Sequence, residues 1–383
     1  MKPIYLDFNA TTPIDPEVAE AMLPYLHEHF GNPSSSHWFG LQARKAVEQA
    51  RQQVAALLGC APEEIIFTSG GSEANNMAIK GVAFRHQHKG NHIITSTVEH
   101  PAVIEVCKYL QERGFETSYL PVDQFGLVDP QQLEQAIRPQ TILITIMHAN
   151  NEVGTIQPVG EIGAIARGHS ILCHTDAAQS VGKIPTRVSE LQVDLLSVAG
   201  HKLHAPKGVG ALYVRKGTEL DKLIHGASQE QNLRAGTENV SQIVGLGKAC
   251  DIAARNMASH MKHMQEMRDL LFHTLQERIP ELRLNGHPQQ RLPNTLSVGF
   301  KNVAVGALLS EVTEIAASAG AACHASTVTI SPVLEAMSVP LEYAAGTVRF
   351  STGRTTTREE ILQAADSIVQ AVRRLAREKD RTP

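Results

Sequence analysis

The chain has 383 residues, of which 42% are hydrophobic and 19% are charged, and its formal net charge is −4. This ordinary globular composition allows two domains with a large core. The small negative charge excludes the basic footprint of a nucleic-acid-binding protein. No apolar run reaches 18 residues, so no membrane span is expected.

The cysteines and the N-terminus predict the compartment. Five cysteines, an odd number, form no Cys-x-x-Cys pair, which argues against disulfides and favours a reducing compartment. The N-terminal residues Met-Lys-Pro-Ile-Tyr-Leu-Asp lack the apolar core of a signal peptide. We therefore expect a cytoplasmic protein.

The first half of the chain alternates helical and strand-like patterns. Apolar residues recur at helical spacing over residues 42–58, and Gly59 is expected to end that helix. Short runs that are apolar on both faces follow at residues 65–67, 92–95, 141–146 and 171–174. Such runs are typical of a buried, mostly parallel sheet.

A glycine turn follows the first of these strands, in Phe67-Thr-Ser-Gly-Gly-Ser-Glu-Ala-Asn-Asn76. Gly70 and Gly71 allow the backbone to approach an anion, and the N–H groups of the next helix point toward it. Ser72 is either the N-cap of this helix or a hydroxyl donor to a phosphate, and one residue can serve both purposes.

Three strand-like runs end in residues that carry chemistry, His100, Asp176 and Lys202. These are the parts that a pyridoxal phosphate (PLP) site needs. The lysine forms the Schiff base, the carboxylate keeps the pyridine nitrogen protonated, and the imidazole can stack on the ring. An isolated lysine after a strand is usually a surface residue, but three such strand ends together favour a cofactor site.

The pattern changes in the second half. A long, polar, Met-rich helix is predicted from about Asp251 to Arg278, with a domain boundary nearby, and residues 283–383 are predicted to form a smaller α+β unit. Within it, Cys323 follows small residues and precedes Ser, Thr and Pro, a pattern typical of a mobile, exposed loop at about 318–332. An accessible thiol of low pKa is nucleophilic, and His324 could help. The other four cysteines, Cys60, Cys107, Cys173 and Cys250, have apolar or helical neighbours and are expected to be structural.

Seven segments in order resemble the cysteine desulfurases, which are PLP enzymes of fold type I in the class V aminotransferase group. They are residues 5–13, 30–35, 67–76, 147–154, 174–182, 234–239 and 349–354. Each is weak alone, but seven in the family's order over nearly the whole chain are specific. The resemblance implies a large PLP-binding domain at 13–255 with a mostly parallel seven-stranded sheet. It also implies a smaller α+β domain formed by 1–12 and 256–383, which carries the Cys323 loop.

The resemblance also implies cofactor contacts. Gln179 is implied to donate to the PLP phenolic oxygen, with Asn151 near that oxygen and near the substrate carboxylate. Gly71, Ser72 and His201 are implied to hold the phosphate. Thr237 is implied to reach the phosphate of a partner subunit, which predicts a homodimer.

Arg349 is implied to bind the substrate carboxylate, because a guanidinium can grip a carboxylate with two hydrogen bonds. The alternative for Arg349 is a structural ion pair, and Arg354 is expected to be structural.

The implied reaction converts L-cysteine to L-alanine. Lys202 removes the Cα proton, and the Cys323 thiolate attacks the substrate sulfur and keeps it as a persulfide. The sulfur then passes to an acceptor protein, such as an iron–sulfur scaffold or a thiolation enzyme. His100 stacks on the cofactor and could relay protons or deprotonate the substrate thiol.

Some segments depart from the family pattern. The residues around Cys323 and the run 331–337 resemble selenocysteine lyases, so L-selenocysteine is an alternative substrate. The other departures are Ser72 for Thr, Ala199 for Ser, Phe8 for Tyr, His204-Ala205 for Tyr-Gly, and Ala227-Ser228 within a usual glycine triplet. These are expected to border the site and leave substrate preference and rate open.

The sequence leaves other functions open. An amino-group transferase would form pyruvate from alanine and would need no loop cysteine. A non-catalytic sulfur-relay scaffold would not need Lys202, Asp176 and His100. His260 and His263, one helical turn apart, raise the possibility of a metal site, but no Cys or carboxylate completes a ligand set, so no metal is predicted.

Overall fold

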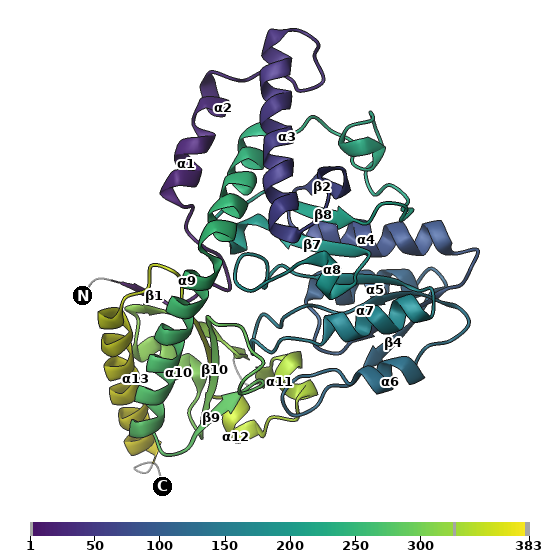
Figure 1. The fold of residues 1–383 in the computed structure, drawn as a ribbon. Coiled ribbons are helices and arrows are strands. Elements are labelled where there is room, and N and C mark those ends of the chain that lie inside the picture. Colours follow the sequence, from purple (N-terminus) through teal and green to yellow (C-terminus); the bar gives the residue numbers. More distant parts are fainter. Residues whose placement is uncertain (1–2, 325–326, 380–383) are drawn as a thin grey trace.

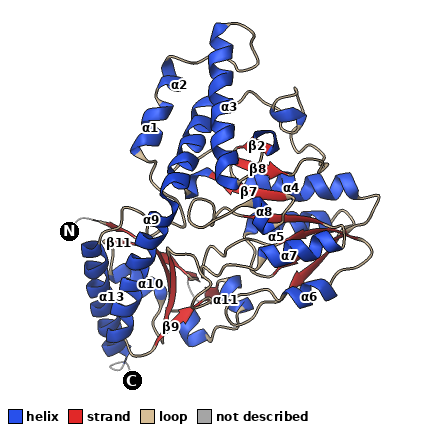
Figure 2. Cartoon of the chain, in the orientation of Figure 1, coloured by secondary structure: helices blue, strands red, loops and turns tan. Residues whose placement is uncertain are grey.

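The computed structural model describes residues 3–324 and 327–379, and the side chains of residues 321–329, 378 and 379 lie outside the described part. Two units share the long helix α9 (Val240–Arg278), as Figure 1 shows. The larger unit is built on a seven-stranded sheet and the smaller on a four-stranded antiparallel sheet, both red in Figure 2. None of the described helices is long and apolar enough to cross a membrane.

The large sheet confirms the mostly parallel, seven-stranded prediction. Its strands in spatial order are β2 (Ile65–Thr68), β8 (Gly210–Val214), β7 (Leu195–Ala199), β6 (Leu172–Asp176), β5 (Thr141–Thr145), β3 (His92–Ser96) and β4 (Glu116–Leu120). Only β8 runs antiparallel to its neighbours. Every residue of β3, β5 and β7 is buried, because helices cover both faces of the sheet.

One face of this sheet packs on α4 (Gly71–His86) and α5 (Pro101–Gln111). The other face packs on α3 (Trp38–Leu58), α7 (Val159–Gly168) and the first half of α9. Gly59 ends α3 in the left-handed conformation, with φ 69°, as the sequence predicts.

Helix α9 begins at Val240, well before the predicted start at Asp251. Gly245 and Gly247 lower helix propensity, which hid this first part of the helix. The structure shows why a glycine is needed at 247: an added Cβ would lie 2.5 Å from Cα of Ala50 in α3. The close approach of two helices therefore outweighs local propensity.

The smaller unit has the strand order β12 (Ser318–Ala319), β15 (Thr347–Ser351), β10 (Thr295–Phe300) and β9 (Leu282–Asn285). The second half of α9, α10 (Val305–Glu311) and α13 (Arg358–Lys379) pack around its core. The N-terminal strand β1 (Ile4–Tyr5) pairs in parallel with β11 (Ile315–Ala316), so the first residues lie against the C-terminal unit. The exact domain limits at 12/13 and 255/256 stay predictions.

The remaining elements are short. They are α1 (Pro16–Met22), α2 (Pro24–His27), α6 (Pro130–Gln135), α8 (Val188–Leu191), α11 (Pro332–Ala336), α12 (Leu341–Ala344) and the 3-10 turns Pro62–Glu64, Gly200–Lys202 and Glu230–Asn232.

The segment around Cys323 is a β-hairpin rather than the irregular loop that the small residues predict. Strands β13 (Ala321–His324) and β14 (Thr327–Ile330) pair antiparallel, with Cys323 opposite Val328. The four consecutive β-branched residues of Thr327–Ile330 favour a strand, a signal that the neighbouring glycine, alanines and proline concealed. The Cys323 side chain lies outside the described residues.

Candidate active site

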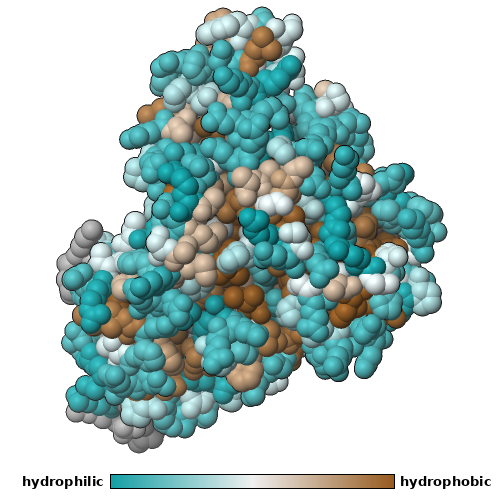
Figure 3. Space-filling view, in the orientation of Figure 1, coloured by the Kyte–Doolittle hydropathy of each residue, from teal (hydrophilic) through white to brown (hydrophobic). Residues whose placement is uncertain are grey.

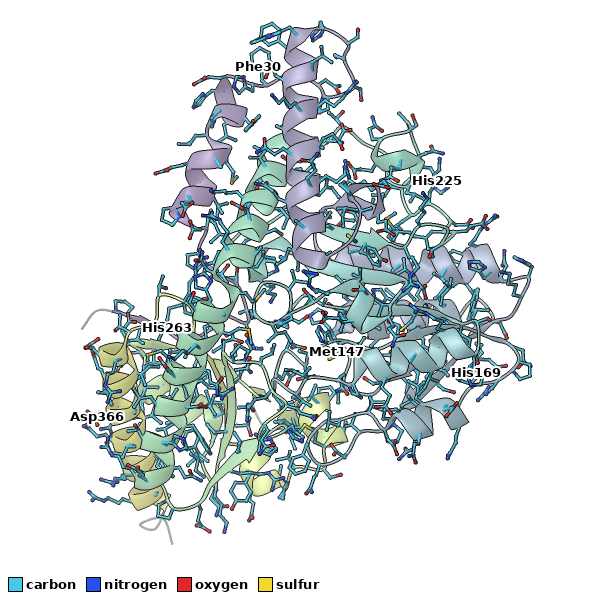
Figure 4. The ribbon with its side chains drawn as sticks, viewed as in Figure 1. Phe30, Met147, His169, His225, His263 and Asp366 are labelled. Carbon is cyan, nitrogen blue, oxygen red and sulfur yellow. The ribbon has the colours of Figure 1, made fainter. Side chains whose placement is uncertain are left out.

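A cavity of about 330 Å³ brings together most of the predicted site residues. It lies at the carboxyl ends of the parallel strands, where polar side chains of different strands meet. Its lining includes Gly71, Ser72, His100, Asn151, Asp176, Gln179, His201, Lys202 and Arg349. Met147, labelled in Figure 4, also lines it and marks its place between the two units.

Lys202 ends a 3-10 turn directly after β7, so its amine reaches the cavity. Its Nζ donates hydrogen bonds to the carbonyl oxygens of Asn9 and Ala10, the latter at 2.8 Å. Burial, assisted by the Arg349 guanidinium, lowers the pKa of Lys202 to about 8. A substantial fraction of this amine is therefore uncharged at mildly alkaline pH and can act as a nucleophile or base.

Asp176 is the last residue of β6 and is buried. Its Oδ2 accepts a 2.6 Å hydrogen bond from Nδ2 of Asn75, and its Oδ1 accepts one from the backbone N–H of Ala178. The carboxylate is thus held in one orientation at the cavity wall. Oδ1 of Asn75 is buried without a hydrogen-bond partner among the described residues.

His100 is the N-cap of α5, and its Nδ1 accepts a 3.0 Å hydrogen bond from the backbone N–H of Ala102. Burial lowers the pKa of His100, while Asp176 raises it and Lys202 lowers it further. An uncharged imidazole that accepts at Nδ1 carries its proton on Nε2. The helix cap therefore selects the tautomer of this ring.

The start of α4 is where the sequence predicts an anion cradle, and its Gly71 and Ser72 line the cavity. Gly70, with φ 153°, is the N-cap and supplies no side-chain cap, so the interpretation of Ser72 as the N-cap is wrong. An added Cβ at Gly71 would lie 3.2 Å from Cβ of Ala199. Ala199, where the family more often has Ser, therefore lies beside the start of α4.

His201 lies at the same end of the cavity. Its Nδ1 contacts the Thr11 hydroxyl at 3.2 Å. Burial, with Lys202 and nearby lysines, lowers the pKa of His201 to about 4. The ring is therefore uncharged at neutral pH, and its Nε2 is available as a donor when the Thr11 hydroxyl donates to Nδ1.

Gln179 is buried and joins a network that sequence reasoning missed. Its Nε2 donates to the Asn9 carbonyl oxygen at 2.9 Å, and its Oε1 accepts from Nζ of Lys183 at 2.9 Å. Nζ of Lys183 also donates to Oδ1 of Asn9 at 3.2 Å. Asn9 lies in the N-terminal motif at residues 5–13, but its position in that motif does not indicate a role in this hydrogen-bond network.

Arg349 lies where the cavity meets the smaller unit. Its Nη2 donates to Oδ1 of Asp7 at 2.8 Å and to Oγ of Ser318 at 2.7 Å, and its Nη1 donates to the Asn151 carbonyl oxygen at 3.0 Å. Its Nε is buried without a hydrogen-bond partner in the described part of the chain. Arg349 thus has the predicted structural ion pair and also lines the cavity.

Thr237 is exposed and does not line this cavity. Ala227 and Ser228 line a different cavity, together with Arg51 and Glu230, and the expectation that they border the site stays a prediction. This position could not be read from the sequence, because it depends on how the segment that contains Ala227 and Ser228 packs beside α3.

Two departures lie together behind Lys202. The rings of Phe8 and His204 are 6.2 Å apart, and both residues line a small cavity with Lys202. Gly353 makes room for Phe8, since an added Cβ would lie 2.2 Å from that ring. Arg354 forms an ion pair with Asp15, as expected of a structural residue.

The described cysteines are free thiols, and burial raises the pKa of Cys60, Cys107, Cys173 and Cys250 to about 12. Such thiols are protonated and unreactive at neutral pH. His263 contacts the Thr356 carbonyl oxygen, and the part of the chain that the structure describes contains no group of three potential ligands for a metal ion.

The strand-end lysine Lys202, the buried Asp176 and Gly71 at the start of α4 line one cavity of this α/β fold. A profile of the family Aminotransferase class-V matches residues 4–363. The chain is 50% identical over 374 residues to a cysteine desulfurase IscS of Dictyoglomus turgidum, which covers 97% of this chain and 95% of that relative. The chain therefore belongs to the class V aminotransferase family and, within it, groups with the cysteine desulfurases.

Solved structures agree with this grouping. A NifS-like protein has a TM-score of 0.92 and 39% identity, over 97% of this chain and 100% of that chain. The protein SspA, solved in complex with cysteine, has a TM-score of 0.81 and 39% identity, over 92% of this chain and 100% of that chain. The family and fold predictions are confirmed, and the names of these relatives do not favour the selenocysteine lyase alternative.

Proposed function

We propose that this protein is a PLP-dependent cysteine desulfurase that forms L-alanine from L-cysteine and transfers the sulfur through Cys323. The observation that carries the proposal is the grouping of Lys202, Asp176 and the α4 cradle around one cavity. The family is PLP-dependent, and the residues fit the group. The cradle suits a phosphate, Asp176 suits a pyridinium nitrogen, and the unpartnered Oδ1 of Asn75 leaves a polar atom beside it.

When bound, the cofactor supplies an electron sink for carbanion chemistry at the substrate Cα. Lys202 holds the cofactor and then serves as the base at Cα, which its lowered pKa of about 8 supports. His100 would stack over the cofactor. Because its Nδ1 is already an acceptor and Nε2 carries the proton, its uncharged ring can donate a hydrogen bond from Nε2 but has no free lone pair with which to remove a proton from the substrate thiol.

Arg349 binds the substrate carboxylate. Its existing ion pair with Asp7 keeps the guanidinium in place at the cavity wall. Asn151 contributes its side chain to the same region of the cavity. A carboxylate held here fixes which substituents of Cα face the cofactor and the cysteine hairpin.

Cys323 receives the sulfur. Support comes from the backbone, since the hairpin β13–β14 follows β12, whose Ser318 hydroxyl contacts Arg349 at 2.7 Å. The chain that carries the nucleophile is thus anchored to the substrate-binding arginine. Cys107, Cys173 and Cys250 are buried, and the raised pKa of these thiols and of the half-buried Cys60 argues against them as nucleophiles.

The chain is proposed to act as a homodimer. Thr237 is exposed, as expected for a residue that reaches the phosphate site of a partner subunit. An arm formed by α1, α2 and the start of α3 lies at the top of Figures 1 and 3. It carries exposed apolar side chains, including Phe30, Trp38 and Phe39, and Phe30 marks its tip in Figure 4. A sulfur-acceptor protein, such as an iron–sulfur scaffold or a thiolation enzyme, and a cytoplasmic location complete the proposal.

The direct test is turnover of L-cysteine. With PLP and dithiothreitol present, the protein should release L-alanine and sulfide in a 1:1 ratio. An amino-group transferase, which would not need Cys323, would form pyruvate from L-alanine and a 2-oxo acid. We expect no pyruvate in this assay. Pyruvate without sulfide would show that the transferase alternative is correct. L-Selenocysteine, tested in parallel, should not be preferred to L-cysteine.

A further inference from the structure

Lys183 is a buried lysine without an ion pair. It is 5% exposed, and among the residues that the structure describes no carboxylate lies within salt-bridge distance of its Nζ. Burial lowers the pKa of Lys183 well below its ordinary value, and Lys202 and Arg349 lower it further. A lysine in such a place is costly, so its two hydrogen bonds must contribute something that an apolar residue would not.

These bonds restrict two amides. Nζ of Lys183 donates to Oε1 of Gln179 at 2.9 Å and to Oδ1 of Asn9 at 3.2 Å. A charged amine has only donors, and an uncharged amine still has two N–H groups for these two acceptors. With Lys183 as the donor, both amides present their oxygen atoms to Lys183 and their NH2 groups elsewhere.

The NH2 group of Gln179 is consequently directed toward the Lys202 side of the network. It donates to the Asn9 carbonyl oxygen at 2.9 Å, the same oxygen that accepts a hydrogen bond from Lys202. The orientation of the Asn9 amide is also fixed, with its oxygen toward Lys183. Its Nδ2 donates to Oγ1 of Thr295 at 2.8 Å, and its Oδ1 accepts from Nδ2 of Asn294. Every donor and acceptor in this network agrees with one orientation of each amide.

We propose that Lys183 is a positioning residue that holds the Gln179 amide with its N–H toward the phenolic oxygen of the cofactor. The inference rests on the proposed function, in which the cofactor is bound at Lys202. An N–H that donates to this oxygen stabilises its anionic form and so lowers the proton affinity of the bound cofactor. Without Lys183, the Gln179 side chain loses its anchor and this donor is no longer held in place.

The test is a pH titration of the visible absorption of the holoenzyme. Lys183→Met removes the donors while keeping the length of the side chain, and it should raise the proton affinity about tenfold, a rise of about one pH unit in the midpoint. Lys183→Arg keeps donors at this position and should change the affinity less than about threefold. Lys248→Met is the matched control, because Lys248 pairs with Glu17 and does not line the Lys202 cavity.

A double variant separates positioning from charge. If Lys183 acts through Gln179, the midpoint of Lys183→Met with Gln179→Leu should equal that of Gln179→Leu alone. Additive shifts would show that Lys183 acts by its own charge, and an unchanged midpoint in Lys183→Met would also overturn the inference. Lys183→Ala, checked for folding by circular dichroism, must shift the midpoint in the same direction.

The two proposals fail in different ways. A wild-type protein that shows no visible cofactor band would contradict the proposed function. A wild-type protein with the band, whose midpoint is the same as that of Lys183→Met, would leave the proposed function intact and remove only the role of Lys183.

Discussion

Cys323→Ser should bind PLP and L-cysteine like the wild type but lose alanine production from L-cysteine by roughly 10³-fold or more. A serine hydroxyl has a far higher pKa than a thiol and cannot take up the sulfur. The cofactor spectrum should remain, because the substitution leaves Lys202, Asp176 and the residues at the start of α4 unchanged. Steady-state assays of alanine, together with the absorbance change on addition of L-cysteine, measure both effects.

The control for this experiment is Cys250→Ser. Cys250 lies in α9, is fully buried and has a thiol pKa raised to about 12, so it should not take part in sulfur transfer. L-Selenocysteine can still react in Cys323→Ser, because a carbon–selenium bond breaks more readily. Alanine formation from L-cysteine at the wild-type rate in Cys323→Ser would mean that the protein is a lyase without a nucleophilic cysteine.

Lys202→Ala should abolish the covalent attachment of PLP and reduce turnover by at least roughly 10³-fold, since the variant loses both the attachment point and the base at Cα. The wild type, reduced with borohydride and digested, should carry the cofactor on the peptide that contains Lys202. The variant should carry none. Cofactor trapped on Lys183, the other buried lysine of the network, would show that the assignment of Lys202 is wrong.

The residues at strand ends were predictable from the sequence, because the carboxyl ends of parallel strands must meet at one edge of the sheet. Asp176 ends β6 and Lys202 follows β7, as their patterns indicate. The glycine turn before α4 was equally clear, since strand, glycine pair and helix follow each other directly.

The network behind the site could not be predicted. Lys183 and Asn9 are 174 positions apart, and nothing local to either residue indicates their contact. The tautomer of His100 depends on a helix cap geometry, and the role of Asn75 depends on how α4 lies against β6. The early start of α9 was missed because the packing of α9 on α3 outweighs the low helix propensity of its two glycines. The hairpin at Cys323 was missed because glycine, alanines and proline flank its β-branched strand.

The most direct measurement for the account as a whole is the location of sulfur after one turnover. The holoenzyme is mixed with one equivalent of L-cysteine without reductant, the thiols are alkylated, and the peptides are analysed by mass spectrometry. The account predicts one added sulfur on the peptide that contains Cys323, matched by one equivalent of L-alanine, and none on the peptides of the other four cysteines. Free sulfide with unmodified Cys323, or added sulfur on another cysteine, would contradict it.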